Sequence, residues 1–238
     1  MKAIVLSSGG VDSTTCLGLA VEKFGADEVA TISIFYGQTH SRELISARDV
    51  AKYYNVQHFE MDLSEVFKMS NSSLLTHSTQ KIDHRAYSEQ LKTETRVSTN
   101  VPFRNGVFLS AAASFADSFD TDEIFLYIGA HADDSAGNAY ADCSEDFLKN
   151  FARAVEIGTY NKVKLVAPFA GKNKASVVAE GLRLNVPYEL TWSCYESGEK
   201  PCGTCATCID RKKAFELNGV QDPLERSQHD SENLSCSE

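Results

Sequence analysis

The segment Ala3-Ile4-Val5-Leu6-Ser7-Ser8-Gly9-Gly10-Val11-Asp12-Ser13 joins a short apolar run to a turn rich in serine and glycine. The apolar run, residues 3–6, predicts a buried strand, and residues 13–24 carry apolar side chains at helical spacing. A turn between a strand and a helix gathers backbone N–H groups at the positive end of the helix dipole, where a phosphate binds well. The segment therefore predicts a phosphate-binding loop in an α/β protein.

Strands and helices are expected to alternate along the rest of the chain. Strand-like runs occupy residues 29–35, 57–63, 123–129 and 164–167, and helical patterns occupy 41–54, 105–119, 145–157 and 174–184. This alternation is typical of a parallel sheet with helices on both faces, which is a Rossmann-like α/β fold. We expect a nucleotide-binding domain over 1–190 with a polar insertion at 70–100, a small zinc-binding segment over 191–218, and a disordered tail over 219–238.

The composition argues against two classes of partner. The chain has 238 residues, of which 42% are apolar, and its formal net charge is -10. Stable binding to a nucleic acid is not expected, because such binding depends on Lys and Arg side chains that neutralise phosphates. No apolar run is long enough to cross a membrane, and the start of the chain turns polar too soon for a signal peptide, so we expect a cytoplasmic protein.

The serine- and glycine-rich loop matches neither of two common nucleotide-binding motifs. It lacks the Walker pattern Gly-x-x-x-x-Gly-Lys and the dinucleotide pattern Gly-x-Gly-x-x-Gly. Ser8 and Ser13 supply hydroxyl donors for phosphates, and Asp12 offers oxygen ligands for Mg²⁺. A plain capped turn without a ligand is the alternative interpretation.

Four of the seven cysteines lie close together, with the spacing Cys194-x7-Cys202-x2-Cys205-x2-Cys208. Zinc binds four thiolates in a tetrahedron, and Cys-x2-Cys wraps one edge of it. The pattern predicts a closed, structural zinc site. An iron–sulfur cluster is the main alternative, although the Cys-Pro that closes ferredoxin motifs is missing. Free thiols or a disulfide-bonded loop are further alternatives.

The pattern Ser-Gly-Gly-x-Asp-Ser resembles the PP-loop of the ATP pyrophosphatase superfamily, whose members split ATP between its α and β phosphates. Together with the four cysteines, it resembles the 7-cyano-7-deazaguanine synthase family of queuosine biosynthesis. Further similarity to that family lies in residues 36–44, 101–109, 140–143 and 191–195. The resemblance implies an ATP-dependent carbon–nitrogen ligase that uses Mg²⁺, carries structural Zn²⁺ and forms a homodimer.

The activity that this resemblance implies has two stages. The carboxylate of 7-carboxy-7-deazaguanine takes AMP from ATP and releases pyrophosphate, and ammonia then displaces AMP to give an amide. A second ATP activates the amide oxygen, and loss of AMP leaves the nitrile. Such chemistry needs positioning and charge stabilisation and no nucleophilic side chain.

The resemblance also implies which residues act on ATP. We expect Asp12, Ser13, Lys174 and Arg104 to take part in catalysis. The residues expected to hold ATP are Ser7, Ser8, Gly9, Gly10, Val11, Asp12, Ser13, Thr14, Thr15, Cys16 and Leu17. Lys174 begins a late helix, where lysines of similar proteins reach the phosphates; a solvated surface lysine is the alternative.

The substrate is expected to contact Arg104, Asp142 and His40. Arg104 could bind a carboxylate or phosphate through both arms of its guanidinium, or form a structural salt bridge. Asp142 could accept hydrogen bonds from a guanine-like edge, or cap the helix that begins near residue 145. His40 and His131 follow predicted strands at the edge where parallel sheets bind ligands, and either could assist proton transfer or be structural.

Three other functions remain open. An amidotransferase-like ligase that makes a simple amide, such as a nucleotide or cofactor synthetase, would lack the four-cysteine segment. A PP-loop enzyme that thiolates tRNA shares the loop, but it requires a basic surface for tRNA, and the net charge argues against one. A non-catalytic zinc-ribbon binding module shares the cysteines, but it has no need of an intact phosphate-binding loop.

Overall fold

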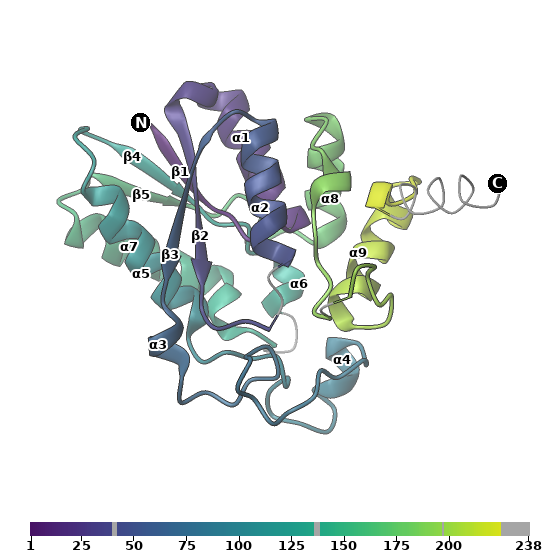
Figure 1. Ribbon diagram of the computed structural model, residues 1–238. Helices are drawn as coiled ribbons and strands as arrows, with labels where there is room; N and C mark the ends of the chain where they lie inside the picture. Colours follow the sequence, from purple (N-terminus) through teal and green to yellow (C-terminus); the bar gives the residue numbers. More distant parts are fainter. Residues whose placement is uncertain (40–41, 136–138, 197, 225–238) are drawn as a thin grey trace.

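The computed structural model describes residues 1–39, 42–135, 139–196 and 198–224, and Figure 1 labels its elements. Its centre is a sheet of five parallel strands in the order β3-β2-β1-β4-β5. The strands are β1 (Ala3–Leu6), β2 (Val29–Phe35), β3 (Gln57–Asp62), β4 (Ile124–Tyr127) and β5 (Val163–Val166). The predicted parallel sheet is confirmed.

The strand order reverses beside β1. The chain passes from β1 outward to β2 and β3, then returns to the other side of β1 to form β4 and β5. Ala3 accordingly pairs in register with Val29 on one side and with Phe125 on the other. Such a reversal leaves a crevice at the carboxyl ends of the two central strands, where open α/β sheets bind ligands. The loops after β1 and β4 therefore meet at the expected binding edge.

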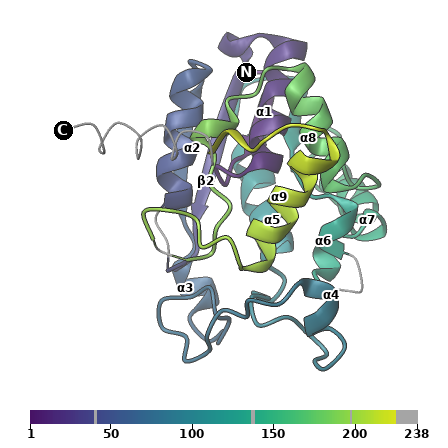
Figure 2. The same ribbon diagram turned by 90° about the vertical axis from the view of Figure 1, so that its right-hand side faces the viewer.

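Helices cover both faces of the sheet (Figures 1 and 2). One face carries α1 (Val11–Phe24), α2 (Arg42–Tyr53), α8 (Lys174–Arg183) and α9 (Ala206–Leu217), and the other carries α5 (Arg104–Asp117) and α7 (Glu145–Gly158). Ala3 and Val5 share one core with Leu17 of α1, whereas Ile4 shares the other with Leu109 of α5. Both faces of β1 are buried, which explains its unbroken apolar sequence.

The remaining elements of the residues that the structure describes are short. They are η1 (Ala26–Glu28), α3 (Ser64–Phe67), α4 (Tyr87–Gln90), α6 (Ala132–Ser135), η3 (Ala141–Cys143) and η4 (Tyr188–Leu190). The predicted strands and long helices are all present, with ends that differ by one or two residues at most. None of the described helices has the length and apolar character needed to cross a lipid bilayer.

The polar segment 71–100 lies beyond the carboxyl ends of β2 and β3, at the bottom of Figure 1. Leu74 and Leu75 are buried in this segment, in a small apolar cluster with Tyr36 and Phe67. The segment therefore packs onto the same edge of the sheet as the expected binding crevice.

Candidate active site

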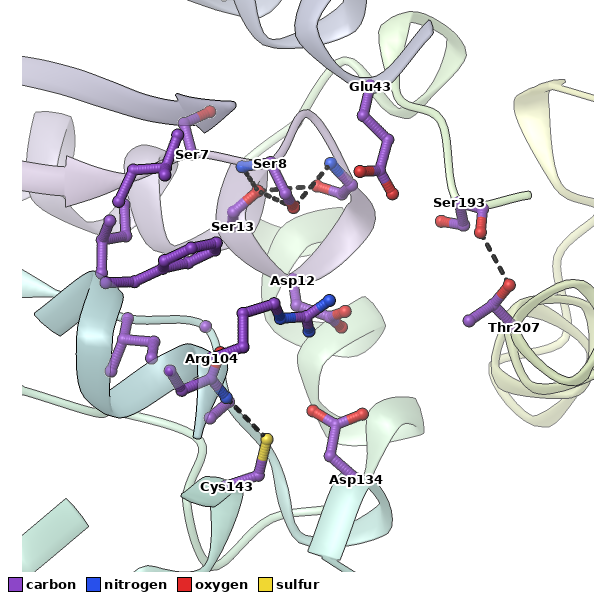
Figure 3. A pocket seen from close by; sticks show the side chains of 18 of the residues that line it. Ser7, Ser8, Asp12, Ser13, Glu43, Arg104, Asp134, Cys143, Ser193 and Thr207 are labelled. Carbon is purple, nitrogen blue, oxygen red and sulfur yellow. Dashed lines mark hydrogen bonds between the residues drawn. The ribbon is translucent and has the colours of Figure 1, made fainter. Parts of the chain in front are cut away.

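A pocket lies at the carboxyl edge of the sheet, where the loops after β1 and β4 meet (Figure 3). Residues from distant parts of the sequence line it together. The predicted site residues among them are Ser7, Ser8, Gly10, Asp12, Ser13, Arg104 and Lys174. Where the strand order reverses, the loops after β1 and β4 diverge and leave a crevice between them. This crevice explains the position of the pocket.

The loop after β1 folds tightly against its neighbours. Gly9 has φ 73°, and a side chain there would overlap the carbonyl oxygen of Glu43. Ser13 Oγ accepts a hydrogen bond from the backbone N–H of Ser8 at 3.2 Å. Gly10 is the N-cap of α1 and has no side chain to cap the first turn. The amide groups at the start of α1 are therefore available to a phosphate.

Lys174 is the charged centre of the site. Its ammonium donates a hydrogen bond to Asp12 Oδ2 at 2.8 Å and lies 3.3 Å from His131 Nε2. Burial opposes the charge of Asp12 and of Lys174 and is the largest single effect on each. Their mutual attraction, together with that of His131 for Asp12 and of Asp134 for Lys174, outweighs it, so the pKa of Asp12 is lowered and that of Lys174 is raised. Lys174 is buried, so it is not a solvated surface lysine.

Asp12 and Asp134 both line the pocket (Figure 3). Oδ1 of Asp12 is buried and accepts no hydrogen bond from the described residues. Oδ1 of Asp134 lies 3.4 Å from His131 Nε2, and burial raises the pKa of Asp134. Hard divalent cations take carboxylate oxygens, so these two residues fit a Mg²⁺ ion beside the phosphates.

Arg104 reaches from the first turn of α5 into the middle of the pocket (Figure 3). Its guanidinium lies over the rings of Tyr36 and Phe108, and its Nη1 lies 3.4 Å from Tyr36 Oη. Within the described parts of the chain, no carboxylate is among the groups that act on its charge most strongly. A half-buried guanidinium on which no carboxylate of the described residues acts strongly suits the carboxylate or phosphate of a ligand.

The other two predicted substrate residues are placed differently. Asp142 Oδ2 accepts a hydrogen bond from the backbone N–H of Asn105 at 2.8 Å, so Asp142 caps the first turn of α5. The helix α7 is capped by Ser144, whose Oγ accepts from Phe147 N at 3.3 Å. Asp142 was expected as a possible cap of α7, but it caps the first turn of α5 instead. His40 lies outside the described residues.

Several residues predicted to hold ATP lie in the body of α1. Thr14 Oγ1 donates to the carbonyl oxygen of Gly10 at 2.7 Å, and Thr15 Oγ1 donates to that of Val11 at 2.8 Å. Cys16 and Leu17 are fully buried in the core. These side chains hold the helix in place behind the loop, and their contact with a nucleotide stays a prediction.

The residues that line the pocket also include Asp134, Tyr140 and Tyr195, which were not among the predicted site residues. One signal was available for Asp134, because it follows β4 at the point where the strand order reverses. Tyr140 and Tyr195 lie in sequence segments that resemble the family, but no spacing brings them together.

The four clustered cysteines form a compact set, and their sulfur atoms lie within 4.8 Å of one another. Backbone N–H groups of Cys202 and Glu196 donate to Cys194 Sγ at 3.2 and 3.3 Å. The helix α9 begins at Ala206, so its positive end lies beside Cys205. Both features favour thiolates, which are the metal-binding form of cysteine.

The spacing of the sulfur atoms fits one metal ion. Zn–S bonds of about 2.3 Å in a tetrahedron place the sulfurs roughly 3.8 Å apart. In a cubane iron–sulfur cluster each thiolate binds a different iron atom, so the sulfurs lie farther from one another. The set at Cys194, Cys202, Cys205 and Cys208 therefore fits a zinc ion.

Two contacts tie the cysteine segment to the rest of the protein. The backbone N–H of Trp192 donates to the carbonyl oxygen of Gly9 at 2.9 Å, and Trp192 Nε1 donates to that of Cys194 at 2.9 Å. Arg211 of α9 is buried and pairs through two hydrogen bonds with Asp222, at 2.6 and 2.8 Å. Trp192 thereby connects the metal-binding segment to the phosphate-binding loop.

Known proteins similar to this chain agree on one family. The family model described as queuosine biosynthesis protein QueC matches residues 2–219. The 7-cyano-7-deazaguanine synthase of Archaeoglobus fulgidus is 41% identical over 225 residues, which cover 94% of this chain and 90% of the relative. The synthase of Caldicellulosiruptor saccharolyticus is also 41% identical over 225 residues, covering 94% and 95%.

A solved structure supports the fold alone. The U34-tRNA thiolase NcsA from Methanococcus maripaludis, solved with its 4Fe-4S cluster, matches with a TM-score of 0.51 and 16% sequence identity. The match covers 92% of this chain and 66% of the thiolase.

Proposed function

The chain belongs to the QueC family of queuosine biosynthesis proteins, and from this premise we propose that it is an ATP-dependent 7-cyano-7-deazaguanine synthase. One observation carries the proposal. One pocket contains both a phosphate-binding loop with Lys174 and the guanidinium of Arg104, for which no carboxylate of the described residues is among the strongest charge influences. An enzyme that joins a carboxylate to the α-phosphate of ATP needs both features close together.

In the first stage, the carboxylate of 7-carboxy-7-deazaguanine attacks the α-phosphorus of ATP and expels pyrophosphate. Ammonia adds to the acyl adenylate, and AMP leaves to give the amide. In the second stage, the amide oxygen attacks another ATP, and loss of AMP and a proton from the adenylated amide gives the nitrile. Each leaving group is a phosphate anion, so charge accumulates on the phosphates in every step.

The phosphate-binding loop would hold that charge. The amide groups at the start of α1 and the hydroxyls of Ser8 and Ser13 would donate to the phosphate oxygens. The ammonium of Lys174, already oriented by Asp12, would offset charge on the departing pyrophosphate. Because these groups are fixed before the nucleotide arrives, little reorganisation is needed during reaction.

Arg104 would orient the acid substrate. Its guanidinium can bind one carboxylate oxygen and leave the other free to attack phosphorus. The rings of Tyr36 and Phe108 hold the guanidinium in place. The substrate carboxylate would thereby be presented to the α-phosphate as a positioned nucleophile.

Two metals fit the proposal. Asp12 and Asp134 would hold Mg²⁺, which neutralises phosphate charge when it is bound. The four clustered cysteines would hold a structural Zn²⁺, which fixes the fold of the segment around them. We also propose that the enzyme is a cytoplasmic homodimer that takes ammonia as its nitrogen source, as the family resemblance implies, with no stable binding to nucleic acids.

The proposed function is tested by mixing the purified protein with ATP, Mg²⁺, an ammonium salt and 7-carboxy-7-deazaguanine. We expect the nitrile to appear by mass spectrometry, with the amide as an intermediate and two pyrophosphates released per nitrile. A protein that contains zinc but yields neither amide nor nitrile under these conditions would contradict the proposal. Arg104→Lys should raise the KM for the acid substrate more than the KM for ATP, because an ammonium lacks the planar guanidinium that lies over Tyr36 and Phe108 and therefore orients the carboxylate less firmly.

A further inference from the structure

The first turn of α5 carries Asn105 directly after Arg104, and both residues line the pocket. The Asn105 side chain donates a hydrogen bond from Nδ2 to Cys143 Sγ at 3.0 Å (Figure 3). The amide oxygen of Asn105, Oδ1, accepts no hydrogen bond from the residues that the structure describes. The amide is thereby held with an N–H toward Cys143, and Oδ1 is left as an acceptor.

Two residues of η3 hold Asn105 in this orientation. Asp142 Oδ2 accepts from the backbone N–H of Asn105 at 2.8 Å, and Cys143 accepts from its side chain. Cys143 is buried and belongs to the core on the α5 face of the sheet, so its sulfur has a fixed position. A side chain held at both its backbone and its amide loses little freedom when a ligand binds, and Asn105 is therefore suited to orient one.

The backbone just before these residues is strained. Phe103 has φ 52° and ψ 32°, in the left-handed region that bulky L-residues rarely adopt. Its ring lies against Gly106, where a Cβ atom would be 2.3 Å from a ring carbon, and it packs edge-on against Phe147 with centroids 5.7 Å apart. Strain of this kind persists where the surrounding structure enforces it, and it is concentrated at functional sites. Here it fixes the direction in which Arg104 and Asn105 leave the start of α5.

The free oxygen of Asn105 restricts what can bind beside it. A ligand whose carboxylate pairs with Arg104 occupies the pocket that Asn105 also lines. Asn105 is half-buried, and its oxygen costs free energy when a ligand removes its water without supplying a donor. A ligand that brings an N–H group to Oδ1 avoids this cost. The heterocycle of the proposed acid substrate carries such groups on its rings and as an exocyclic amine.

We propose that Asn105 is a specificity residue, which accepts through Oδ1 a hydrogen bond from one N–H group of the acid substrate, and that Cys143 is a positioning residue, which holds the amide in that orientation. This inference rests on the proposed function. It divides recognition between two consecutive side chains, because Arg104 binds the carboxylate and Asn105 recognises the ring that carries it.

Binding of the acid substrate to the zinc-loaded protein tests Asn105. Calorimetry is carried out in the presence of a non-hydrolysable ATP analogue. Asn105→Leu keeps the approximate size of the side chain and removes its acceptor, so we expect the Kd for the acid substrate to rise roughly fivefold, equivalent to about 1 kcal/mol. The Kd for the ATP analogue should stay within about twofold, because the loop after β1 forms that site.

Asn150→Leu is the matched control. Asn150 is an exposed asparagine of α7, and its Nδ2 donates to Asp146 in the same helix. This variant should bind both ligands as the parent does. Zinc content and near-UV circular dichroism show that each variant is folded, and Asn105→Ala provides the same comparison if leucine at this position prevents folding.

Substrate analogues identify the N–H group that Asn105 recognises. Three deazapurine carboxylates are compared, which lack in turn the exocyclic amino group, the N–H of the six-membered ring and the N–H of the five-membered ring. The analogue without the recognised N–H should bind equally to the parent and to Asn105→Leu. The other two should keep the roughly fivefold difference, as the logic of a double-mutant cycle requires.

The positioning role of Cys143 is tested by two replacements. Cys143→Ala should raise the Kd for the acid substrate roughly twofold to threefold and should weaken discrimination against the same analogue. Cys143→Ser, whose hydroxyl still accepts from Nδ2, should restore both. A merely structural role for Cys143 would leave the discrimination between analogues unchanged.

The possible failures can be told apart. If the parent makes the nitrile but Asn105→Leu binds the acid substrate as tightly as the parent does, the inference alone is overturned. A difference of full size for all three analogues would overturn it too, because Asn105 would then not be accepting from the ligand. A parent enzyme that makes no nitrile would overturn the proposed function and this inference with it.

Discussion

The backbone N–H of Trp192 donates a hydrogen bond to the carbonyl oxygen of Gly9 at 2.9 Å, across a large separation in sequence. Gly9 belongs to the phosphate-binding loop, and Trp192 lies two residues before the first cysteine of the metal site. The guanidinium of Arg42 also lies over the Trp192 ring, 5.1 Å from its centroid. The metal-binding segment is therefore part of the support of the nucleotide site.

Removal of the metal should weaken nucleotide binding. Without zinc, the segment that carries Trp192 loses its fixed conformation, so its contact with Gly9 is lost. We expect the Kd for ATP, measured by calorimetry, to rise roughly tenfold after chelation, which corresponds to about 1.4 kcal/mol. The affinity should return when Zn²⁺ is added back. Tight ATP binding by the metal-free protein would show that the two sites are independent.

Loss of the Asp12–Lys174 pair should slow the chemistry strongly. Lys174→Ala removes the ammonium that would stabilise the departing pyrophosphate, and we expect pyrophosphate release to fall ~10²–10³-fold. Asp12→Asn should have an effect of similar size, because Lys174 loses its orienting partner. The exposed neighbour Lys172 provides the control, and Lys172→Ala should release pyrophosphate at the parent rate.

The stability cost of adding a side chain at Gly9 can be compared with the cost at Gly25. Both have positive φ, 73° and 80°, but a side chain at Gly9 would overlap Glu43, whereas one at Gly25 would meet nothing within 4 Å. Gly25→Ala should cost about 1 kcal/mol of unfolding free energy through backbone strain alone. Gly9→Ala should cost about 2 kcal/mol more, because the loop must also move away from α2. Urea denaturation measures both, and equal costs would show that the loop tolerates the side chain.

Mild acid should destabilise the fold through His58. Burial lowers the pKa of His58 below its ordinary value of 6.5, while Glu60 acts in the opposite direction. The folded state binds this proton less readily than the unfolded state. The free energy of unfolding is therefore not reduced by His58 above pH 6.5, and it decreases as the pH falls from 6.5 through the lowered pKa. Unfolding free energies measured across this range should decline less steeply in His58→Gln than in the parent. Parallel curves would rule out His58 as the titrating group.

The features that the sequence predicted correctly are local ones. The strand at residues 3–6, the loop after it and the parallel alternation each depend on patterns within a few residues of one another. The cysteine spacing likewise predicted a compact set of thiols, because a metal site of that kind is built within one short segment. The sequence did not predict α9. Metal-site cysteines occupy its start, where a helix is usually recognised from the spacing of apolar side chains.

The features that the sequence could not supply depend on long-range contacts. Lys174 was equally compatible with a surface position, and only the path of the chain from β5 brings it to Asp12. The polar segment 71–100 has no regular period, yet it brings Tyr87 to Tyr140 and Tyr195. Asp142 was expected to contact the substrate or to cap α7, and the structure shows it accepting from the backbone N–H of Asn105 in α5, so only the expected cap is wrong and the substrate contact stays a prediction. Each outcome is decided by tertiary packing, which residue spacing does not encode.

The buried pair between Arg211 and Asp222 sets a limit on how far the protein can be shortened. Deletion of the chain after residue 224 removes neither partner, whereas deletion after residue 220 leaves the Arg211 guanidinium uncompensated inside the protein. A buried charge that loses its counter-ion costs about 3–5 kcal/mol, a large part of the stability of a typical domain. We therefore expect the shortest polypeptide of full stability to extend beyond the end of the family match at residue 219 and to include Asp222.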